Sequence, residues 1–213
     1  MQNIFEPQRF GDLVFASADT KSVLNDIRTG ALPFPSGKHG IILYGSFGTG
    51  KTASAPIICD MIEQANSGSA LAIEPYVIDC EGSERIDQIL NTAEDRRQIL
   101  SANLSNLHYF IFDEVDSLTD PAQRKLRMFM QRTHVVTVMT TNYIDKLDGG
   151  LKDRCYQLEI NPLTNAQMRQ SVLQRVKDNN LTPPTEEQLE QLIASSNGSW
   201  RQVMPKLRKF YGV

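Results

Sequence analysis

The sequence predicts an α/β fold, in which a doubly wound sheet of five parallel strands is followed by a small domain of three helices. Five short apolar runs alternate with segments of helical spacing between residues 41 and 160. The runs are apolar at most positions, which is typical of central strands covered by helices on both faces. After residue 160 only helical patterns follow, so we expect the last helices to form a separate part of the fold.

The expected elements of the first part follow one another in a regular order. Strands are expected at residues 41–44, 72–78, 108–112, 135–140 and 156–160. Helices are expected between them at residues 52–65, 86–101 and 120–131. Asp120 is the expected N-cap of the third of these helices, with Pro121 at its first helical position.

Residues 1–160 are therefore expected to form the α/β domain and residues 161–213 a helical domain. Residues 161–164 interrupt the sequence of strands and helices, and Thr164 is the expected N-cap of the helix that follows. Helices are expected at residues 164–179, 185–196 and 199–211, with Pro and Asn-Gly breaks between them.

The composition predicts a folded globular chain without a general affinity for nucleic acid. Of 213 residues, 40% are hydrophobic and 22% are charged, and the formal net charge is −3. A local strip of a few cations would still suffice for contact with phosphates. Cys59, Cys80 and Cys155 show no paired spacing, which favours reduced thiols over a zinc site or disulfides. With no signal peptide or membrane span visible, we expect a cytoplasmic protein.

The strongest chemical signal is residues 45–52, a complete G-x-x-x-x-G-K-T between an expected strand and an expected helix. Its glycines let backbone N–H groups surround phosphate oxygens at the positive end of a helix dipole. Lys51 adds a charge on the β- and γ-phosphates, and Thr52 offers a hydroxyl to Mg²⁺. A chance glycine turn is the alternative, but the flanking strand and helix disfavour it. The residues expected to hold the nucleotide here are Gly45, Ser46, Phe47, Gly48, Thr49, Gly50, Lys51, Thr52 and Ala53.

Two acids follow the apolar run at residues 108–112. Asp113 is expected to hold Mg²⁺ together with Thr52, and Glu114 to orient the attacking water and accept its proton. Acidic residues directly after a strand are common and, taken alone, are weak evidence for a catalytic site. Combined with the phosphate loop about 60 residues earlier, it predicts hydrolysis of a nucleoside triphosphate by in-line attack.

Three further polar residues are candidates for the same reaction. Asn142 ends the next strand and is expected to position the water, although a loop-capping Asn is the alternative. Arg201 opens the last helix and is expected to fold back onto the phosphates, unless it is simply solvated. Arg154 precedes the last strand and is expected to reach a neighbour's γ-phosphate as an arginine finger, with a surface salt bridge as the alternative.

Together these motifs resemble those of AAA+ ATPases, a class of P-loop NTPases. Within that class they are most similar to the small motor subunits of sliding-clamp loaders, replication factor C and its phage relatives. Residues 45–52 resemble the Walker A motif and residues 112–116 the Walker B motif. The resemblance extends to residues 9–15 (the adenine-side box), 78–87 (the segment after the second strand), 113–130 (the run D-E-x-D-x-L-T…A-Q…L-R…M) and 154–155 (the end of the S-R-C motif).

The resemblance implies roles for individual residues and for ATP and Mg²⁺ as cofactors. Asn142 falls at the sensor 1 position, Arg201 at the sensor 2 position and Arg154 at the trans-acting finger. The residues implied near adenine are Phe10, Val14 and Phe15. The residues implied in DNA contact are Arg85, Arg124 and Arg127, the last two on the same helix as Gln123.

The resemblance further implies an ATPase acting in DNA replication, in the cytoplasm at the replication site, or in host cytoplasm if viral. Its implied partners are other AAA+ subunits in a homo- or hetero-oligomer, a sliding clamp and primer–template DNA. Two departures from the family are expected: Asp153 stands where the family has Ser, and a collar domain is not expected after the helices. The alternatives are another DNA-associated AAA+ ATPase, such as a helicase loader or a regulator of transposition or recombination, and a nucleotide-gated binding module that hydrolyses little.

Overall fold

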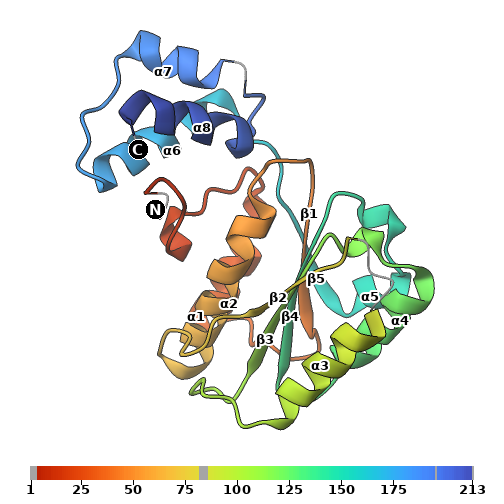
Figure 1. The fold of residues 1–213 in the computed structure, drawn as a ribbon. Coiled ribbons are helices and arrows are strands. Elements are labelled where there is room, and N and C mark those ends of the chain that lie inside the picture. The colour runs from red at the N-terminus through yellow and green to blue at the C-terminus, as the bar shows by residue number, and fades with distance from the viewer. Residues whose placement is uncertain (1–3, 82–85, 195, 213) are drawn as a thin grey trace.

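A parallel five-stranded sheet in the order β2-β3-β4-β1-β5 forms the centre of the larger part of the molecule (Figure 1). The structure is a computed structural model that describes residues 4–81, 86–194 and 196–212. The strands are β1 (Gly40–Tyr44), β2 (Tyr76–Asp79), β3 (His108–Asp113), β4 (Val135–Thr141) and β5 (Cys155–Glu159). All neighbouring pairs are parallel, which confirms the predicted α/β class.

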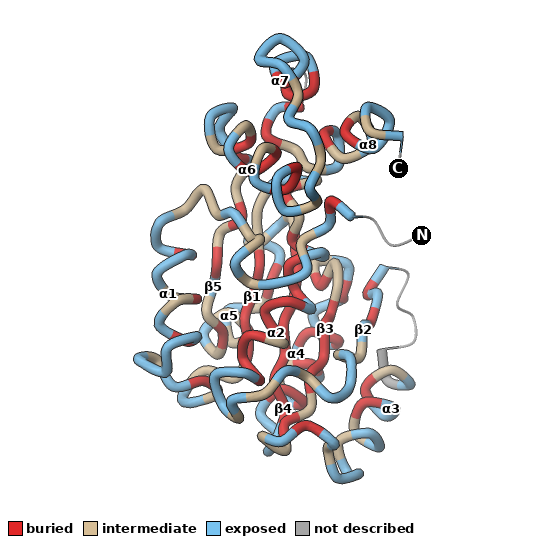
Figure 2. Tube along the Cα trace, turned by 90° about the vertical axis from the view of Figure 1, so that its left-hand side faces the viewer, coloured by how far each residue is buried: buried red, intermediate tan, exposed pale blue. Residues whose placement is uncertain are grey.

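Helices cover both faces of this sheet. One face carries α1 (Ala18–Thr29) and α2 (Lys51–Ser67), and the other carries α3 (Ile86–Gln98), α4 (Asp120–Phe129) and the short α5 (Gly149–Asp153). Successive residues of each strand face opposite sides. Ile41 thus packs in the core under α1 and α2, whereas Ile42 packs in the core under α3 and α4. Figure 2 shows buried residues concentrated along the central strands.

Three helices above the sheet form a third, separate core. They are α6 (Asn165–Asp178), α7 (Glu186–Ile193) and α8 (Trp200–Tyr211), and we call them the lid. Met168, Val172 and Leu207 are fully buried between them. Phe5 from the N-terminal segment is also fully buried in this core, with its ring 5.6 Å from that of Tyr211. The N-terminal segment therefore packs against the lid as well as against the sheet domain, and the proposed division at residue 160 stays a prediction.

The structure differs from the sequence prediction at several element boundaries. The second strand begins at Tyr76 rather than residue 72, because Pro75 has no N–H to donate to the sheet. The helix α1 was not predicted, although Ser17 caps it through the Thr20 N–H and Gly30 ends it in a left-handed conformation. The N-cap of α4 is Thr119, one residue before the predicted one.

Short elements were also missed. Besides α5, the described residues include 3-10 helices η1 (Phe10–Asp12), η2 (Val115–Ser117) and η3 (Ile144–Lys146). Elements of three to five residues span too few turns to show a hydrophobic period. None of the helices in the described ranges is long and apolar enough to span a bilayer.

Candidate functional site

A cavity of about 350 Å³ opens between the carboxyl ends of the central strands and the lid. Its size is within the range of pockets that hold small molecules. One side is formed by the loop before α2, another by the ends of β3 and β4, and a third by the N-terminal segment and the lid. The residues that line it are Glu6, Pro7, Leu13, Val14, Phe15, Phe47, Gly48, Thr49, Gly50, Lys51, Thr52, Ala53, Ser54, Glu114, Thr140, Asn142, Ile160, Arg175, Trp200, Arg201 and Met204.

The loop between β1 and α2 is held tightly by its surroundings. Gly45 has a φ of +142°, and a Cβ there would lie 2.5 Å from the carbonyl oxygen of Ile160. Gly48 has a φ of +73°, and a Cβ there would collide with Ser199 of the lid. Both positions therefore require glycine, because the backbone is left-handed there and because Ile160 or Ser199 of the same chain approaches closely.

Lys51 begins α2 and its side chain folds back over the loop. The Nζ group donates to the carbonyl oxygens of Gly45 at 2.9 Å and Ser46 at 2.7 Å. Burial, followed by the nearby charge of Arg201, lowers the pKa of Lys51 to about 8. The charges of Lys51 and Arg201 therefore repel each other in the cavity, and a polyanion bound there would relieve this repulsion and raise the pKa of Lys51.

Asp113 joins two other elements through its carboxylate. Thr52 donates its hydroxyl to the two carboxylate oxygens at 3.0 and 3.2 Å, and Thr140 at the end of β4 donates to the same carboxylate. The predicted pair of magnesium ligands, Thr52 and Asp113, is thus in direct contact. Oxygen ligands of this kind suit Mg²⁺ when phosphate oxygens complete the shell. Thr140 was not predicted, although it lies on the same strand end as Asn142.

Glu114 lines the cavity next to this pair. Its backbone is left-handed, with a φ of 56°, and its N–H donates to the Thr140 hydroxyl at 3.1 Å. Burial and then the charge of Glu81, with smaller contributions from nearby acids, raise the pKa of Glu114. A raised pKa makes a carboxylate a better proton acceptor near neutral pH, as a general base requires.

Asn142 faces the cavity from the end of β4. Asp116 fixes the local backbone, since it accepts from the Asn142 N–H at 3.3 Å and from the Thr141 hydroxyl at 2.5 Å. The side-chain oxygen of Asn142 is buried and has no hydrogen-bond partner among the described residues. A bound water or ligand hydroxyl would supply the missing donor.

The lid contributes Arg201 to the same cavity. The Arg201 N–H donates to the carbonyl oxygen of Gly48 at 3.3 Å, and the Ser199 hydroxyl donates to that oxygen at the same distance. Val14 and Phe15 also line the cavity. Phe10 does not, because its position in η1 turns its ring against Phe15, with 6.3 Å between the ring centroids.

Several other predicted residues lie away from the cavity. Arg154, at the end of α5, donates to the carbonyl oxygen of Gly150 at 2.9 Å. Arg124 is exposed on α4, whereas Arg127 forms an ion pair of 2.9 Å with Asp148. Arg85 lies outside the described residues.

Gln123, buried on the same helix, ties α4 to the segment before α5. It donates to the Lys146 carbonyl at 3.2 Å and accepts from the Asp148 N–H at 2.7 Å. These two contacts of Gln123, like those of Thr140, were not visible in the sequence because their partners are 20 or more residues away.

The fold, together with the motifs that meet at the cavity, places this protein in the class of P-loop ATPases. The family described as "ATPase family associated with various cellular activities (AAA)" matches residues 41–163, and the chain belongs to this family. ATP hydrolysis is the activity of its class.

Within this class the chain is similar to replication factor C subunits. It is 26% identical over 211 residues to the small subunit of Picrophilus torridus, covering 94% of this chain and 60% of the relative. It is 28% identical over 172 residues to subunit 3 of Saccharomyces cerevisiae, covering 79% and 48%. The chain thus spans between about half and 60% of these relatives' length.

Solved structures confirm the fold. The RuvB Holliday junction branch migration motor of Thermotoga maritima matches with a TM-score of 0.69 at 15% identity, covering 98% of this chain and 66% of that one. The Aeropyrum pernix ORC1 protein in complex with DNA matches with a TM-score of 0.68 at 19% identity, covering 96% and 62%.

The lowered pKa of Lys51 predicts that nucleotide affinity depends on pH. Below about pH 8 the free lysine is protonated and attracts phosphates, and above it this charge is lost. The dissociation constant of a non-hydrolysable ATP analogue should therefore rise about tenfold between pH 7 and pH 9, measured by calorimetry. Lys51→Arg remains charged over this range and should show weaker but pH-independent binding. Equal pH dependence in both proteins would contradict the assignment.

Proposed function

We propose that the chain is the ATP-hydrolysing module of a clamp-loader-like assembly that acts in DNA replication. The observation that carries this proposal is the division of the predicted catalytic residues into two places. Glu114, Asn142 and Arg201 line one cavity with the phosphate loop, whereas Arg154 lies outside it. Such a site is completed by a second subunit, and similarity to replication factor C subunits supports a replication role.

The residues of the cavity suit the binding of ATP with Mg²⁺. The N–H groups at the start of α2 and the Lys51 ammonium would bind the phosphates. Thr52 and Asp113 would hold the cation, which spreads the charge that develops on the phosphate oxygens. Val14, Phe15 and Met204 provide apolar contact on the base side of the same cavity.

Hydrolysis then requires a positioned water. Asn142 orients the water, and Glu114 accepts its proton as the oxygen attacks the γ-phosphorus in line. The bond between the γ-phosphorus and the bridging oxygen breaks, which releases ADP and phosphate. Arg201 of the lid stabilises the negative charge that the transferring group carries.

Arg154 is the proposed contribution from a neighbouring subunit. It lies at the end of α5, beside the Asp153 that departs from the family motif. An arginine finger is worth about 10³–10⁵ in rate in the systems where it has been measured. Hydrolysis by this chain is therefore proposed to depend on assembly with other AAA+ subunits.

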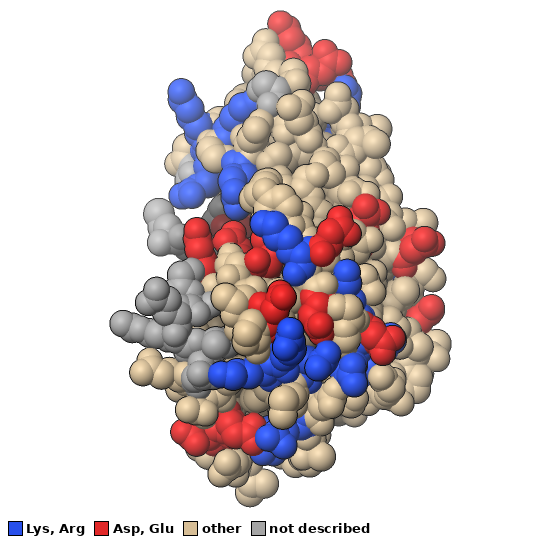
Figure 3. Space-filling view, turned by 90° about the vertical axis from the view of Figure 1, so that its right-hand side faces the viewer, with Lys and Arg blue, Asp and Glu red and all other residues tan. Residues whose placement is uncertain are grey.

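The outer surface offers regions for the two other proposed partners. On the face that carries α3, α4 and α5, Lys and Arg side chains gather in a band beside acidic ones (Figure 3). Arg124 is the better candidate for a DNA phosphate contact, because Arg127 is already paired with Asp148. For a protein partner such as a clamp, the loop after α3 exposes Leu100 and Leu104 by 87% and 74%.

The proposal predicts ATP hydrolysis that depends on DNA and on assembly. Hydrolysis should increase at least several-fold when primer–template DNA is added, and light scattering should show an oligomer in ATP and Mg²⁺. A monomer that hydrolyses ATP equally with and without this DNA would contradict the clamp-loader role. That result would favour another AAA+ function, such as a loader or regulator of a different DNA enzyme.

The proposed general base predicts a separation of binding from turnover. Glu114→Gln should lower the hydrolysis rate by about 10²–10⁴ and leave the affinity for ATP within about threefold, since only proton transfer is removed. Turnover is measured by phosphate release and binding by a fluorescent nucleotide. Glu74→Gln is the matched control, because Glu74 is an exposed acid before β2 that does not line the cavity. Unchanged turnover in Glu114→Gln would exclude the role.

The proposed finger predicts complementation between two inactive variants. Arg154→Ala and Glu114→Gln should each be inactive alone, and an equimolar mixture should recover a fraction of the wild-type rate. Recovery occurs because Glu114→Gln subunits still supply Arg154 to neighbours that retain Glu114. Arg28→Ala, an exposed arginine on α1, is the control and should keep the wild-type rate. Two folded, ATP-binding variants that form mixed oligomers without recovery would contradict a trans role.

A further inference from the structure

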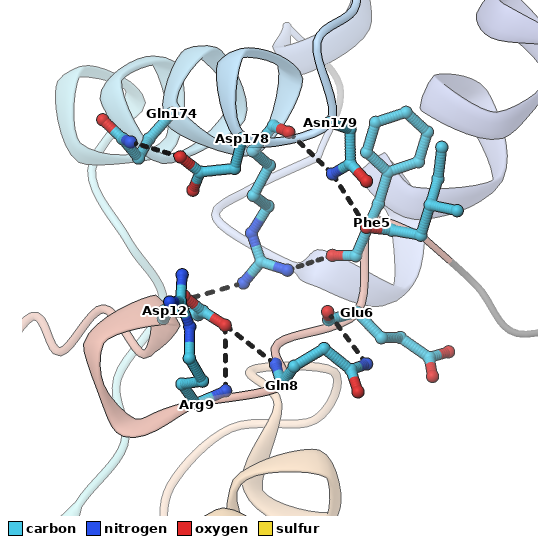
Figure 4. Close-up of polar contacts among 10 residues, drawn as sticks. Phe5, Glu6, Gln8, Arg9, Asp12, Gln174, Asp178 and Asn179 are labelled. Atoms are coloured by element: carbon cyan, nitrogen blue, oxygen red, sulfur yellow. Dashed lines mark hydrogen bonds and ion pairs between the residues drawn. The ribbon is translucent and has the colours of Figure 1, made fainter.

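Arg175 is a buried arginine of the lid that the proposed reaction does not use. It lies on α6, is only 9% exposed and lines the cavity. Its guanidinium donates to the carbonyl oxygen of Phe5 and, at 3.4 Å, to that of Asp12 (Figure 4). One side chain therefore ties two points of the N-terminal segment to the lid, and the cavity-lining residues Glu6 and Pro7 lie between those points.

The same guanidinium also contacts the helix that carries Arg201. Its central carbon lies 4.3 Å from the centre of the Trp200 ring, which is a cation–π distance. Trp200 is the first residue of α8, between Ser199 and Arg201, whose hydrogen bonds reach the carbonyl oxygen of Gly48. A continuous series of contacts thus runs from the N-terminal segment through Arg175 to the phosphate loop.

The charge of Arg175 is incompletely compensated in this structure. Its Nε is buried and has no hydrogen-bond partner among the described residues. Burial lowers the pKa of the guanidinium, and nearby carboxylates offset this only in part.

Figure 4 shows that two of these carboxylates have other partners. Asp12 accepts from the N–H groups of Gln8 and Arg9 at 2.9 Å each, and Asp178 accepts from Gln174 at 2.8 Å. A buried cation without a full counter-charge is costly, so an anion in the cavity that Arg175 lines would stabilise this arrangement.

We propose that Arg175 is a positioning residue that couples the binding of a nucleoside triphosphate to the seating of α8, and with it Arg201, over the phosphate loop. This inference rests on the proposed function, because it takes ATP as the anion. The bound triphosphate stabilises the Arg175 charge, and Arg175 in turn holds the N-terminal segment and Trp200 in the positions that close the base side. Arg175 acts through these groups and transfers no proton.

The test uses Trp200 as a built-in probe, because it is the single tryptophan of the chain. The variants are Arg175→Met, which removes the charge, and Arg175→Lys, which keeps the charge but lacks the planar guanidinium group with its several donors. Arg169→Met is the matched control, since Arg169 lies on the same helix and pairs with Glu186 and Glu190 at the surface. Trp200 emission is followed while a non-hydrolysable ATP analogue with Mg²⁺ is added, and KM and kcat are measured for ATP.

In the wild type and in Arg169→Met, the analogue should change Trp200 emission in a saturable way. In Arg175→Met this change should be lost, and KM should rise at least tenfold. Its kcat should fall less than KM rises, because the catalytic residues are intact. Arg175→Lys should recover part of both the affinity and the emission change. If Arg175 served only to form the hydrogen bonds of its guanidinium group, Arg175→Lys would not recover them.

Three results separate the possible failures. Affinity within twofold of wild type and an unchanged emission response in Arg175→Met would overturn the inference and leave the proposed function standing. If Arg175→Met does not fold, by circular dichroism without nucleotide, Arg175→Lys decides, and wild-type behaviour of that variant overturns the coupling. A folded wild type that binds no ATP analogue would overturn the proposed function, and the inference with it.

Discussion

The contact between Thr52 and Asp113 is the interaction on which the site depends. It joins the first turn of α2 to the end of β3, and Thr140 from β4 donates to the same carboxylate. Three segments that are far apart in sequence therefore meet at one carboxylate. This meeting is possible because β3 and β4 are parallel neighbours, so that their carboxyl ends lie at the same edge of the sheet. Moving either strand by one residue would turn Asp113 or Thr140 to the opposite face.

The lid forms the other side of the site, through hydrogen bonds to the backbone of the phosphate loop. Gly48 allows Ser199 and Arg201 to approach the loop, and its carbonyl oxygen accepts a hydrogen bond from each. Phe5 fills the lid core, so the N-terminal segment forms a bridge between the lid and the sheet domain. The cavity is consequently a joint between two packed units, and a ligand that fills it contacts both.

The sequence predicted what depends on local pattern. The strands, the phosphate loop and the acids after β3 are continuous in the chain, and the structure places Lys51, Thr52, Glu114 and Asn142 around one cavity. It did not predict what depends on distant packing. The hydrogen-bond partners of Thr140 and Arg175 lie 26 to 170 residues away, and no local spacing marks these residues. The helix α1 is different, because Ser17 and Gly30 were visible as its caps and were not used.

Three arginines illustrate how position decides function in this fold. Arg201 reaches the cavity because the α8 backbone is bonded to the phosphate loop. Arg154 is partly exposed at the end of α5, away from the cavity, and in the proposed assembly its charge would act on the site of a neighbouring subunit. Arg175 is buried, so its charge is felt strongly within the low-dielectric interior and is costly until an anion arrives. A bound triphosphate would offset that cost within one subunit. Arg154 would make hydrolysis of the same nucleotide depend on the presence of a neighbouring subunit. Lid closure and subunit assembly would then both depend on the charge of a single ligand.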